Sequence, residues 1–474
     1  MPHQEAAWRQ ATFALNLSAA APWNAMLEPP HRVSIGPEYY DAIYRCGAAL
    51  ADSDRNPFDL VLSYHRDSIV HSALVGDDCG NVTAFPAGVF GMNRLNHCPP
   101  IFEEYYRSGD ERLRETALRW CDNYHDLSIW WGTRCAGEFG GTRYNNVRRS
   151  SDAHKDADGF MWRSNTAVSF CTKDYDSFFY AYEETGDPRM AAALRWQVAY
   201  AKESVHADRG ECRNVGDVLD FVRLHHFTGR QDYLDEAMRL FRDLRTKLST
   251  GDLFDQGGKP IEKDLPFLDD DRAGLRHGYA KPYIIGYVLA GLPALASRYP
   301  DEPKLRDVVR AVAAFLAESQ DPLGGWRYPH PRSSEVNLSQ AMEHARQLVQ
   351  AAHLLGPEAP CLDAIENVLR QRILGWKKTG RILSGLDAWE VATGHVRERA
   401  QLASLYKLPT DRDFTRDYTE GSIAIGSSRP EGLVYFPEVL AYYLQCRPAE
   451  RLLRLPHEDE PLGRVLNRLP DARR

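Results

Sequence analysis

Apolar residues recur along this chain at the spacing of a helix, on both sides of short turns. In the segment 177–201, Phe179 and Tyr182 share a helical face before the turn, and Met190 begins a second face after it. Gly186 stands between the two, where the end of a helix favours a residue with positive φ. The pattern therefore predicts a hairpin of two helices.

The hairpin pattern recurs through the chain, with short turns and long connections. The copies are 101–124, 177–201, 218–244, 286–319, 341–373 and 439–455. An open α-solenoid would repeat with more uniform lengths than these. We therefore predict an all-α fold, an (α/α)6 toroid of six helical hairpins over residues 35–455, between an N-terminal extension 1–34 and a C-terminal tail 456–474.

Long connections on one side of a repeat array usually carry its function. The richest connection, 128–165, holds Trp130, Trp131 and Trp162 among arginine, asparagine and histidine residues. Flat aromatic faces suit the CH-rich face of a sugar, and guanidinium and amide groups suit its hydroxyls and carboxylates. The connection therefore predicts a carbohydrate site, although the same tryptophans could simply anchor the loop.

Two further segments place polar residues directly before a predicted helix. Asn96 and His97 precede the first hairpin, and His277, Tyr279 and Lys281 precede the apolar helix that follows. Pro282 fits the first turn of that helix, near which anions are favoured. We expect these residues to border the same site as the connection 128–165, although a satisfied polar corner is an equal reading of His277 to Lys281.

Gln320, Gly324 and Trp326 have the Q-x-x-x-G-x-W spacing that fastens adjacent helices in α/α repeat proteins. Fastening is the first expectation for this segment. Contact between Trp326 and a substrate is the second.

Charge and composition limit the classes of partner that we expect for this protein. The formal net charge is −8, with no long basic stripe, which argues against nucleic acid. The apolar stretches are too short to span a membrane, and the nine cysteines form no CxxC pair. We expect no metal or other cofactor and, since no basic segment opens the chain, a cytoplasmic location. The oligomeric state is not indicated.

Several blocks of the sequence resemble a known family. These are NRLNHCPPIFEEYYRSGD, GGTRYNN, FMWRSN, SFFYAYEETGDPRM and QDPLGGWRYPHP. Together they resemble the toroidal catalytic domain of exo-acting polysaccharide lyases, in the exo-rhamnogalacturonan lyase-like and ulvan lyase-like families. The resemblance implies a carbon–oxygen lyase that cleaves a uronic-acid-containing polysaccharide by β-elimination.

β-Elimination at a uronate requires groups that neutralise the carboxylate, a base that takes the C5 proton, and an acid that protonates the departing oxygen. Arginine and asparagine suit the first role, and histidine, lysine or tyrosine suit the others. We assign catalytic roles to His97, Tyr144, Asn146, His154 and Tyr279, and substrate contacts to Asn96, Arg143, Asn145, Trp162, Arg163, Asn165, His277, Lys281 and Trp326.

Two other classes stay open. A glycoside hydrolase acting on a glucuronyl or unsaturated uronyl residue would need carboxylates. Its candidates are Asp176, Asp217, Glu343 and Glu390, each of which could equally be a structural helix residue. A non-catalytic carbohydrate-binding solenoid would explain the aromatic residues but not the density of histidine, tyrosine and lysine.

Overall fold

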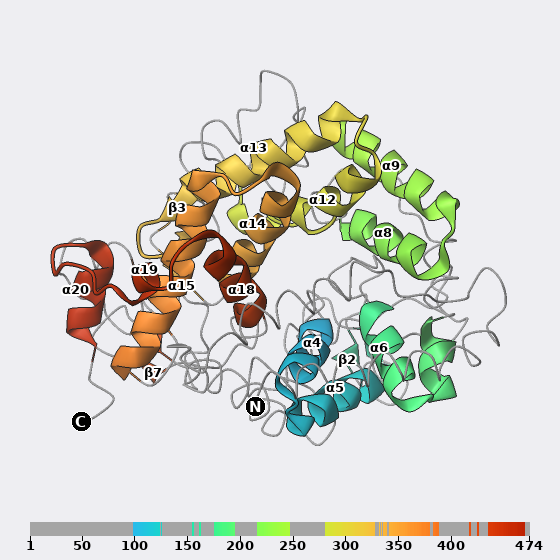
Figure 1. The fold of residues 1–474 in the computed structure, drawn as a ribbon, viewed down its shortest axis with the longest axis horizontal. Helices are drawn as coiled ribbons and strands as arrows, with labels where there is room; N and C mark the ends of the chain where they lie inside the picture. The colour runs from blue at the N-terminus through green and yellow to red at the C-terminus, as the bar shows by residue number, and fades with distance from the viewer. Residues whose placement is uncertain are drawn as a thin grey trace. The chain divides into compact units, whose positions relative to one another are not determined.

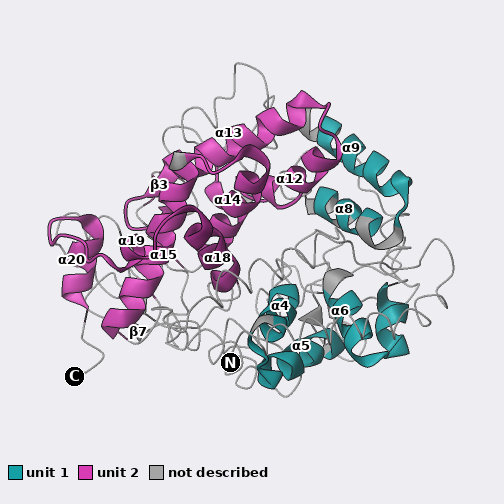
Figure 2. Ribbon diagram, viewed as in Figure 1, with its two compact units in different colours: residues 1–56, 69–209, 213–243 teal, residues 57–68, 210–212, 244–474 magenta. Residues whose placement is uncertain are grey.

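The chain forms two compact units in the computed structural model, which Figure 2 distinguishes by colour. Unit 1 contains residues 1–56, 69–209 and 213–243, and unit 2 contains 57–68, 210–212 and 244–474. The structure describes residues 98–123, 125, 154–155, 161–162, 175–194, 216–246, 280–327, 331, 333, 335–338, 341–379, 383–387, 417–418, 424–425 and 435–469.

Unit 1 is built from helical hairpins (Figure 1). Its helices are α4 (Cys98–Ser108), α5 (Glu111–Asn123), α6 (Tyr175–Thr185), α8 (Gly216–Thr228) and most of α9 (Gln231–Thr246). Residues 188–194 are helical as well, which completes the hairpin begun by α6. Helix α4 packs against α5 and α6, and α6 packs against α8, so the first helices of successive hairpins are neighbours.

The turns of the hairpins follow the sequence prediction. Gly109, Gly186, Gly229 and Gly356 all have positive φ, between 65° and 97°. At Gly109 the amide N–H donates to the Tyr105 carbonyl at 2.8 Å, which closes the last turn of α4. A side chain is strained in this backbone region, which explains why glycine ends these helices.

Unit 2 arranges its helices in two layers. Its elements are α11 (Pro282–Ile285), α12 (Val288–Arg298), α13 (Pro303–Ser319), α14 (Ala341–Leu355), α15 (Ala359–Thr379), α18 (Phe436–Cys446), α19 (Glu450–Leu453) and α20 (Pro461–Arg468). Helices α12, α14 and α18 pack in one row, and α13, α15 and α19 pack in a second row behind them. The prediction of a mainly helical fold of hairpins is thus confirmed. The closure of six hairpins into a toroid, which involves both units together, is kept as the fold prediction.

The long connections of unit 2 meet in a sheet that helical periodicity did not predict. Strands β3 (Gln320–Asp321), β4 (Gly325–Arg327) and β5 (Glu335–Asn337) come from one connection, and β6 (Leu383–Asp387), β7 (Asp417–Tyr418) and β8 (Ala424–Ile425) come from the other. They form an antiparallel sheet in the order β3-β4-β5-β6-β8-β7. Strands of two to five residues are too short for an alternating pattern to mark them in the sequence.

The segment expected to be a tail adds to the core of unit 2. Leu462, Val465 and Leu466 of α20 are buried with Leu374 of α15 and Leu383 of β6. Residues up to Leu469 therefore belong to the packed unit.

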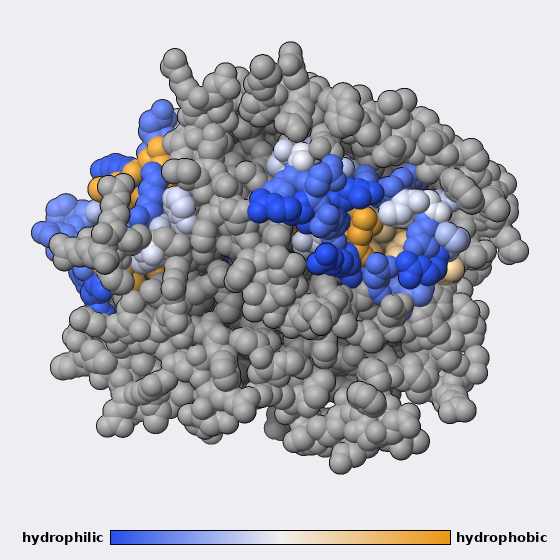
Figure 3. Space-filling view, turned by 90° about the horizontal axis from the view of Figure 1, so that it is seen from below, coloured by the Kyte–Doolittle hydropathy of each residue, from blue (hydrophilic) through white to orange (hydrophobic). Residues whose placement is uncertain are grey.

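On the face shown in Figure 3, most of the described residues are hydrophilic. Among the described residues, Leu455 is the one large hydrophobic side chain that is exposed. None of the described helices is long and apolar enough to cross a membrane.

Candidate functional site

Ten of the predicted site residues lie outside the described residues, and their roles stay predictions. They are Asn96, His97, Arg143, Tyr144, Asn145, Asn146, Arg163, Asn165, His277 and Tyr279.

Two predicted residues of the connection 128–165 are brought together by the backbone. Strands β1 (His154–Lys155) and β2 (Met161–Trp162) pair antiparallel, with His154 directly opposite Trp162. The ribbon therefore places a predicted proton-transfer residue and a predicted sugar-stacking residue at one register position.

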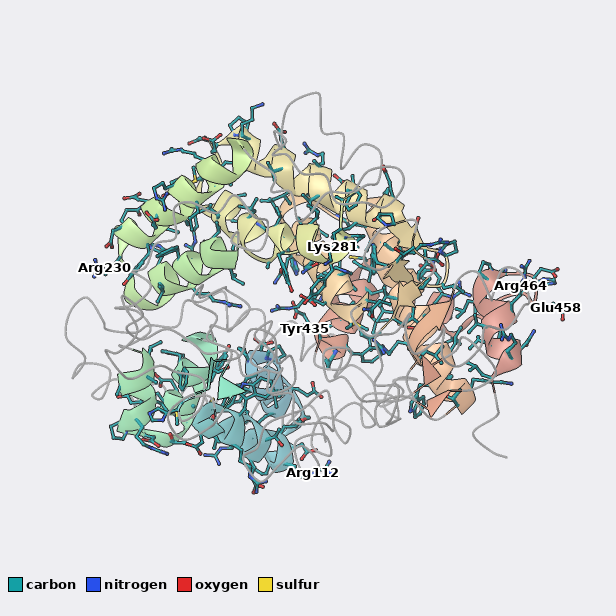
Figure 4. The ribbon with its side chains drawn as sticks, turned by 180° about the vertical axis from the view of Figure 1, so that it is seen from behind. Arg112, Arg230, Lys281, Tyr435, Glu458 and Arg464 are labelled. Carbon is teal, nitrogen blue, oxygen red and sulfur yellow. The ribbon has the colours of Figure 1, made fainter. Side chains whose placement is uncertain are left out.

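Lys281 directly precedes α11 and is partly exposed (Figure 4). Pro282 is the first residue of α11, as predicted. The expected single helix is broken, however, because α11 ends at Ile285 and α12 starts at Val288. Since α11 packs against β4 and α13, the segment with Lys281 is held next to the strand that carries Trp326.

The Gln320–Trp326 segment fastens helices, which confirms the first expectation for it. The indole Nε1–H of Trp326 donates to the Leu316 carbonyl of α13 at 2.9 Å, and the Gln320 amide donates to the Ala364 carbonyl of α15 at 2.8 Å. Gly324, at φ 82°, lies so close to Asn367 that a Cβ would be 2.6 Å from that backbone oxygen. Trp326 is only 2% exposed. It can therefore affect a site only by positioning the residue against which its ring packs.

That residue is His344, in the first turn of α14. The ring centroids of Trp326 and His344 are 4.7 Å apart in an edge-to-face arrangement, and Tyr283 of α11 approaches the same imidazole at 6.3 Å. The imidazole Nδ1 is 2.9 Å from Oε1 of Gln347, and Nε2 of Gln347 donates to Oε1 of Glu343 at 3.5 Å. Glu343, His344 and Gln347 are all at least 95% buried, which makes this a polar cluster inside an apolar layer.

Burial controls the charge of the imidazole. It lowers the pKa of His344 to about 4, and the hydrogen bond with Gln347 only partly opposes that shift. His344 is therefore neutral near pH 7. A neutral imidazole has one N–H donor and one nitrogen lone pair, so His344 can accept a hydrogen bond, whereas its burial disfavours the uptake of a proton.

A second polar contact joins α14 to α18, and the sequence reading did not single it out. Arg346 donates from Nε to Glu438 at 2.8 Å, and its guanidinium lies 4.5 Å from the ring centre of Tyr435, a residue labelled in Figure 4. Glu438 is in the first turn of α18, as Glu343 is in the first turn of α14. A carboxylate near a helix N-terminus is a common sequence feature, which is why its spacing alone gave no signal.

The acids weighed for a hydrolase share one structural position. Asp176 and Asp217 lie in the first turns of α6 and α8, as Glu343 does in α14, while Glu390 lies outside the described residues. All three helices are the first helix of their hairpin. Among the described residues, no group of three or more His, Cys, Asp or Glu is placed to hold a metal ion.

Comparison with known proteins gives structural likenesses only. The sequence matches no protein-family model, and no curated protein matches it. A family 105 glycoside hydrolase of C. acetobutylicum ATCC 824 is similar at a TM-score of 0.48 and 10% identity, over 81% of this chain and 99% of that one. A possible GH105 member from Klebsiella pneumoniae gives 0.46 and 17%, over 83% and 95%. A polysaccharide lyase gives 0.43 and 13%, over 74% and 90%. At these identities, residue roles are argued from this chain's own side chains.

Proposed function

We propose that this protein is an enzyme that degrades a glycan containing uronic acid, and that it cleaves the chain by β-elimination. The observation that carries the proposal is the buried imidazole of His344, held neutral at the beginning of α14 next to Tyr283. A neutral imidazole can accept a hydrogen bond from a sugar hydroxyl group, and a phenol can donate or accept one, so this pair could bind a sugar beside its own carboxylate without adding a further negative charge.

The sequence adds the remaining requirements of the reaction. Arg143, Asn145 and Asn146 would neutralise the uronate carboxylate, and Tyr144, His154 and His97 would transfer protons. The ribbon that pairs His154 with Trp162 supports a sugar site in that connection. Lys281, directly before α11, is a further cation for the carboxylate.

A glycoside hydrolase that acts on a uronyl residue is the second candidate. The buried carboxyl group of Glu343, in a position equivalent to Asp176 and Asp217, favours it. Such an enzyme would use a carboxylic acid to protonate the departing oxygen.

The two reactions leave different products. The purified chain would be incubated with a panel of polygalacturonate, rhamnogalacturonan, ulvan and glucuronan, and with unsaturated uronyl oligosaccharides. A lyase creates a conjugated unsaturated uronate, so ultraviolet absorbance should rise together with new reducing ends. New reducing ends without that absorbance, or loss of absorbance from the unsaturated oligosaccharides, would replace the lyase with the hydrolase. No change with any of these glycans would contradict both.

A further inference from the structure

Glu343, His344 and Gln347 form one hydrogen-bonded chain on a single face of α14. Gln347 follows Glu343 by four residues and His344 by three, and side chains at these separations are neighbours on a helix. The amide of Gln347 thus lies between the carboxyl group and the imidazole, and it bonds to both.

The chemistry of the three groups determines which group donates and which accepts in each of these two hydrogen bonds. The side that Gln347 turns toward Glu343 is its NH2 group, which donates to the carboxyl oxygen Oε1. Its carbonyl oxygen then faces His344 Nδ1 at 2.9 Å and requires an N–H there. In a neutral imidazole with the proton on Nδ1, the lone pair is on Nε2.

We propose that Glu343, acting through Gln347, holds His344 in the Nδ1–H tautomer, so that Nε2 accepts a hydrogen bond from a hydroxyl group of the sugar. This rests on the proposed function for the identity of the ligand, whereas the tautomer itself does not. His344 is then the residue that touches the substrate, and Glu343 and Gln347 are positioning residues that act through it.

The residues packed around this hydrogen-bonded cluster hold the imidazole of His344 in one orientation. Trp326 and Tyr283 meet the imidazole edge-to-face from β4 and α11. On the remaining side, Gly286 lies against the hydrogen bond itself: a Cβ there would come within 2.3 Å of Gln347 Oε1 and 3.0 Å of His344 Nδ1. The absence of a side chain at residue 286 therefore makes room for the bond between Gln347 and His344.

The second nitrogen of the ring is the one that the proposal assigns to the ligand. Within the described part of the chain, Nδ1 is the nitrogen of His344 for which a hydrogen bond is found, and Nε2 is at the tip of the ring, remote from Cβ. The neutral state of the imidazole keeps that lone pair available at neutral pH. The ring of Tyr283 contacts the same imidazole, and Tyr283 belongs to α11, the helix that begins directly after Lys281.

The tautomer can be measured without any substrate. In ¹⁵N-histidine spectra of the full chain, the signals lost in His344→Gln assign the residue. We expect an Nδ1–H pattern in the wild type and a mixture of tautomers in Glu343→Gln. An amide at residue 343 can donate as well as accept a hydrogen bond, so it no longer determines which end of the Gln347 amide faces it.

Two further variants complete the test. Gly286→Ala should cause a similar change by displacing the end of Gln347. Glu358→Gln, the same substitution at an exposed turn residue between α14 and α15, should leave the pattern unchanged. An Nε2–H pattern in the wild type, or an unchanged pattern in Glu343→Gln, would overturn the proposal.

Binding then tests the role of Nε2. Oligosaccharides of galacturonate and glucuronate serve as probes, and the one that binds or reacts is used with each variant. We expect KM or Kd to rise by about fivefold or more in Glu343→Gln and Gln347→Met, since one hydrogen bond contributes ~1 kcal/mol, with kcat less affected. An unchanged KM in a variant with an altered tautomer would refute substrate contact. If no uronate binds, the proposed function and the substrate contact both fail, and the NMR result decides the tautomer alone.

Discussion

The hydroxyl group of Tyr443 in α18 donates a hydrogen bond to Glu366 of α15 at 2.8 Å, and both residues are buried. Arg447 and Arg451 also donate to the same carboxylate oxygen, at 2.9 and 2.8 Å. Burial opposes ionisation of Glu366, but these three hydrogen bonds outweigh it and lower its pKa. Glu366 therefore joins the two layers of unit 2 at one point.

We expect Tyr443→Phe to lower the free energy of unfolding by about 1.5 to 3 kcal/mol, the range for a hydrogen bond to a charged group. Urea unfolding monitored by circular dichroism gives this value. The double mutant with Glu366→Gln tests the assignment, because residues in one network should not show additive effects. Additive losses would mean that the two residues stabilise the unit independently.

Glu183 in α6 should make the stability of unit 1 depend on pH. Its side chain is buried, and its Oε2 has no hydrogen-bond partner among the described residues. Burial raises its pKa to about 8, from an ordinary value of 4.5. Between these two values the folded state keeps a proton that the unfolded state loses. The free energy of unfolding should therefore fall as the pH rises from about 4.5 to 8, by up to ~1.4 kcal/mol per pH unit.

Glu183→Gln should remove this slope and stabilise the protein most at pH 8 and above. Denaturant unfolding at several pH values between 5 and 9 checks it. Glu115→Gln, at an exposed residue of α5 in the same unit, is the matched control and should keep the wild-type slope. A wild-type slope that also persists in Glu183→Gln would show that another group is responsible.

Gly324→Ala and Gly229→Ala compare two glycines of similar φ in different surroundings. At Gly324 an added Cβ meets the Asn367 backbone oxygen at 2.6 Å, whereas nothing lies within 4 Å of a Cβ at Gly229. We expect a loss of ~1 kcal/mol at Gly229 from the left-handed backbone, and an additional ~1 to 3 kcal/mol at Gly324 from crowding. Equal losses in urea unfolding would mean that crowding against α15 contributes nothing.

Tyr144→Phe and Arg143→Ala test the predicted site in the connection 128–165. Removal of the Tyr144 hydroxyl should lower kcat by ~10²-fold or more while KM changes little, as for the loss of a general acid or base. Removal of the Arg143 guanidinium should weaken binding as well as rate, because it would contact the carboxylate before and during the reaction. Formation of unsaturated product by the wild type and both variants gives the comparison. Full activity of Tyr144→Phe would assign proton transfer to another residue.

Local sequence patterns were enough to predict much of the helical architecture. The glycines at 109, 186, 229 and 356 marked the ends of helices, because a helix terminus and its positive φ depend on a few consecutive residues. The spacing of Gln320, Gly324 and Trp326 likewise indicated a fastening between helices, which α13 and α15 provide. Asp176, Asp217 and Glu343 were recognised as candidate acids in helical contexts, and the structure places all three in first turns.

The cluster around His344 could not be read in this way. Within α14 the spacing of Glu343, His344 and Gln347 is visible in the sequence, but the same spacing occurs on many solvated helices. Their burial depends on Trp326 and Gly286, which come from a separate strand and from the end of a different helix. Periodicity along the chain determines which residues are helical and where helices end, since those energies are local. The charge and tautomer of a side chain depend on desolvation and on partners distant in sequence, so only tertiary packing makes a neutral acceptor of His344.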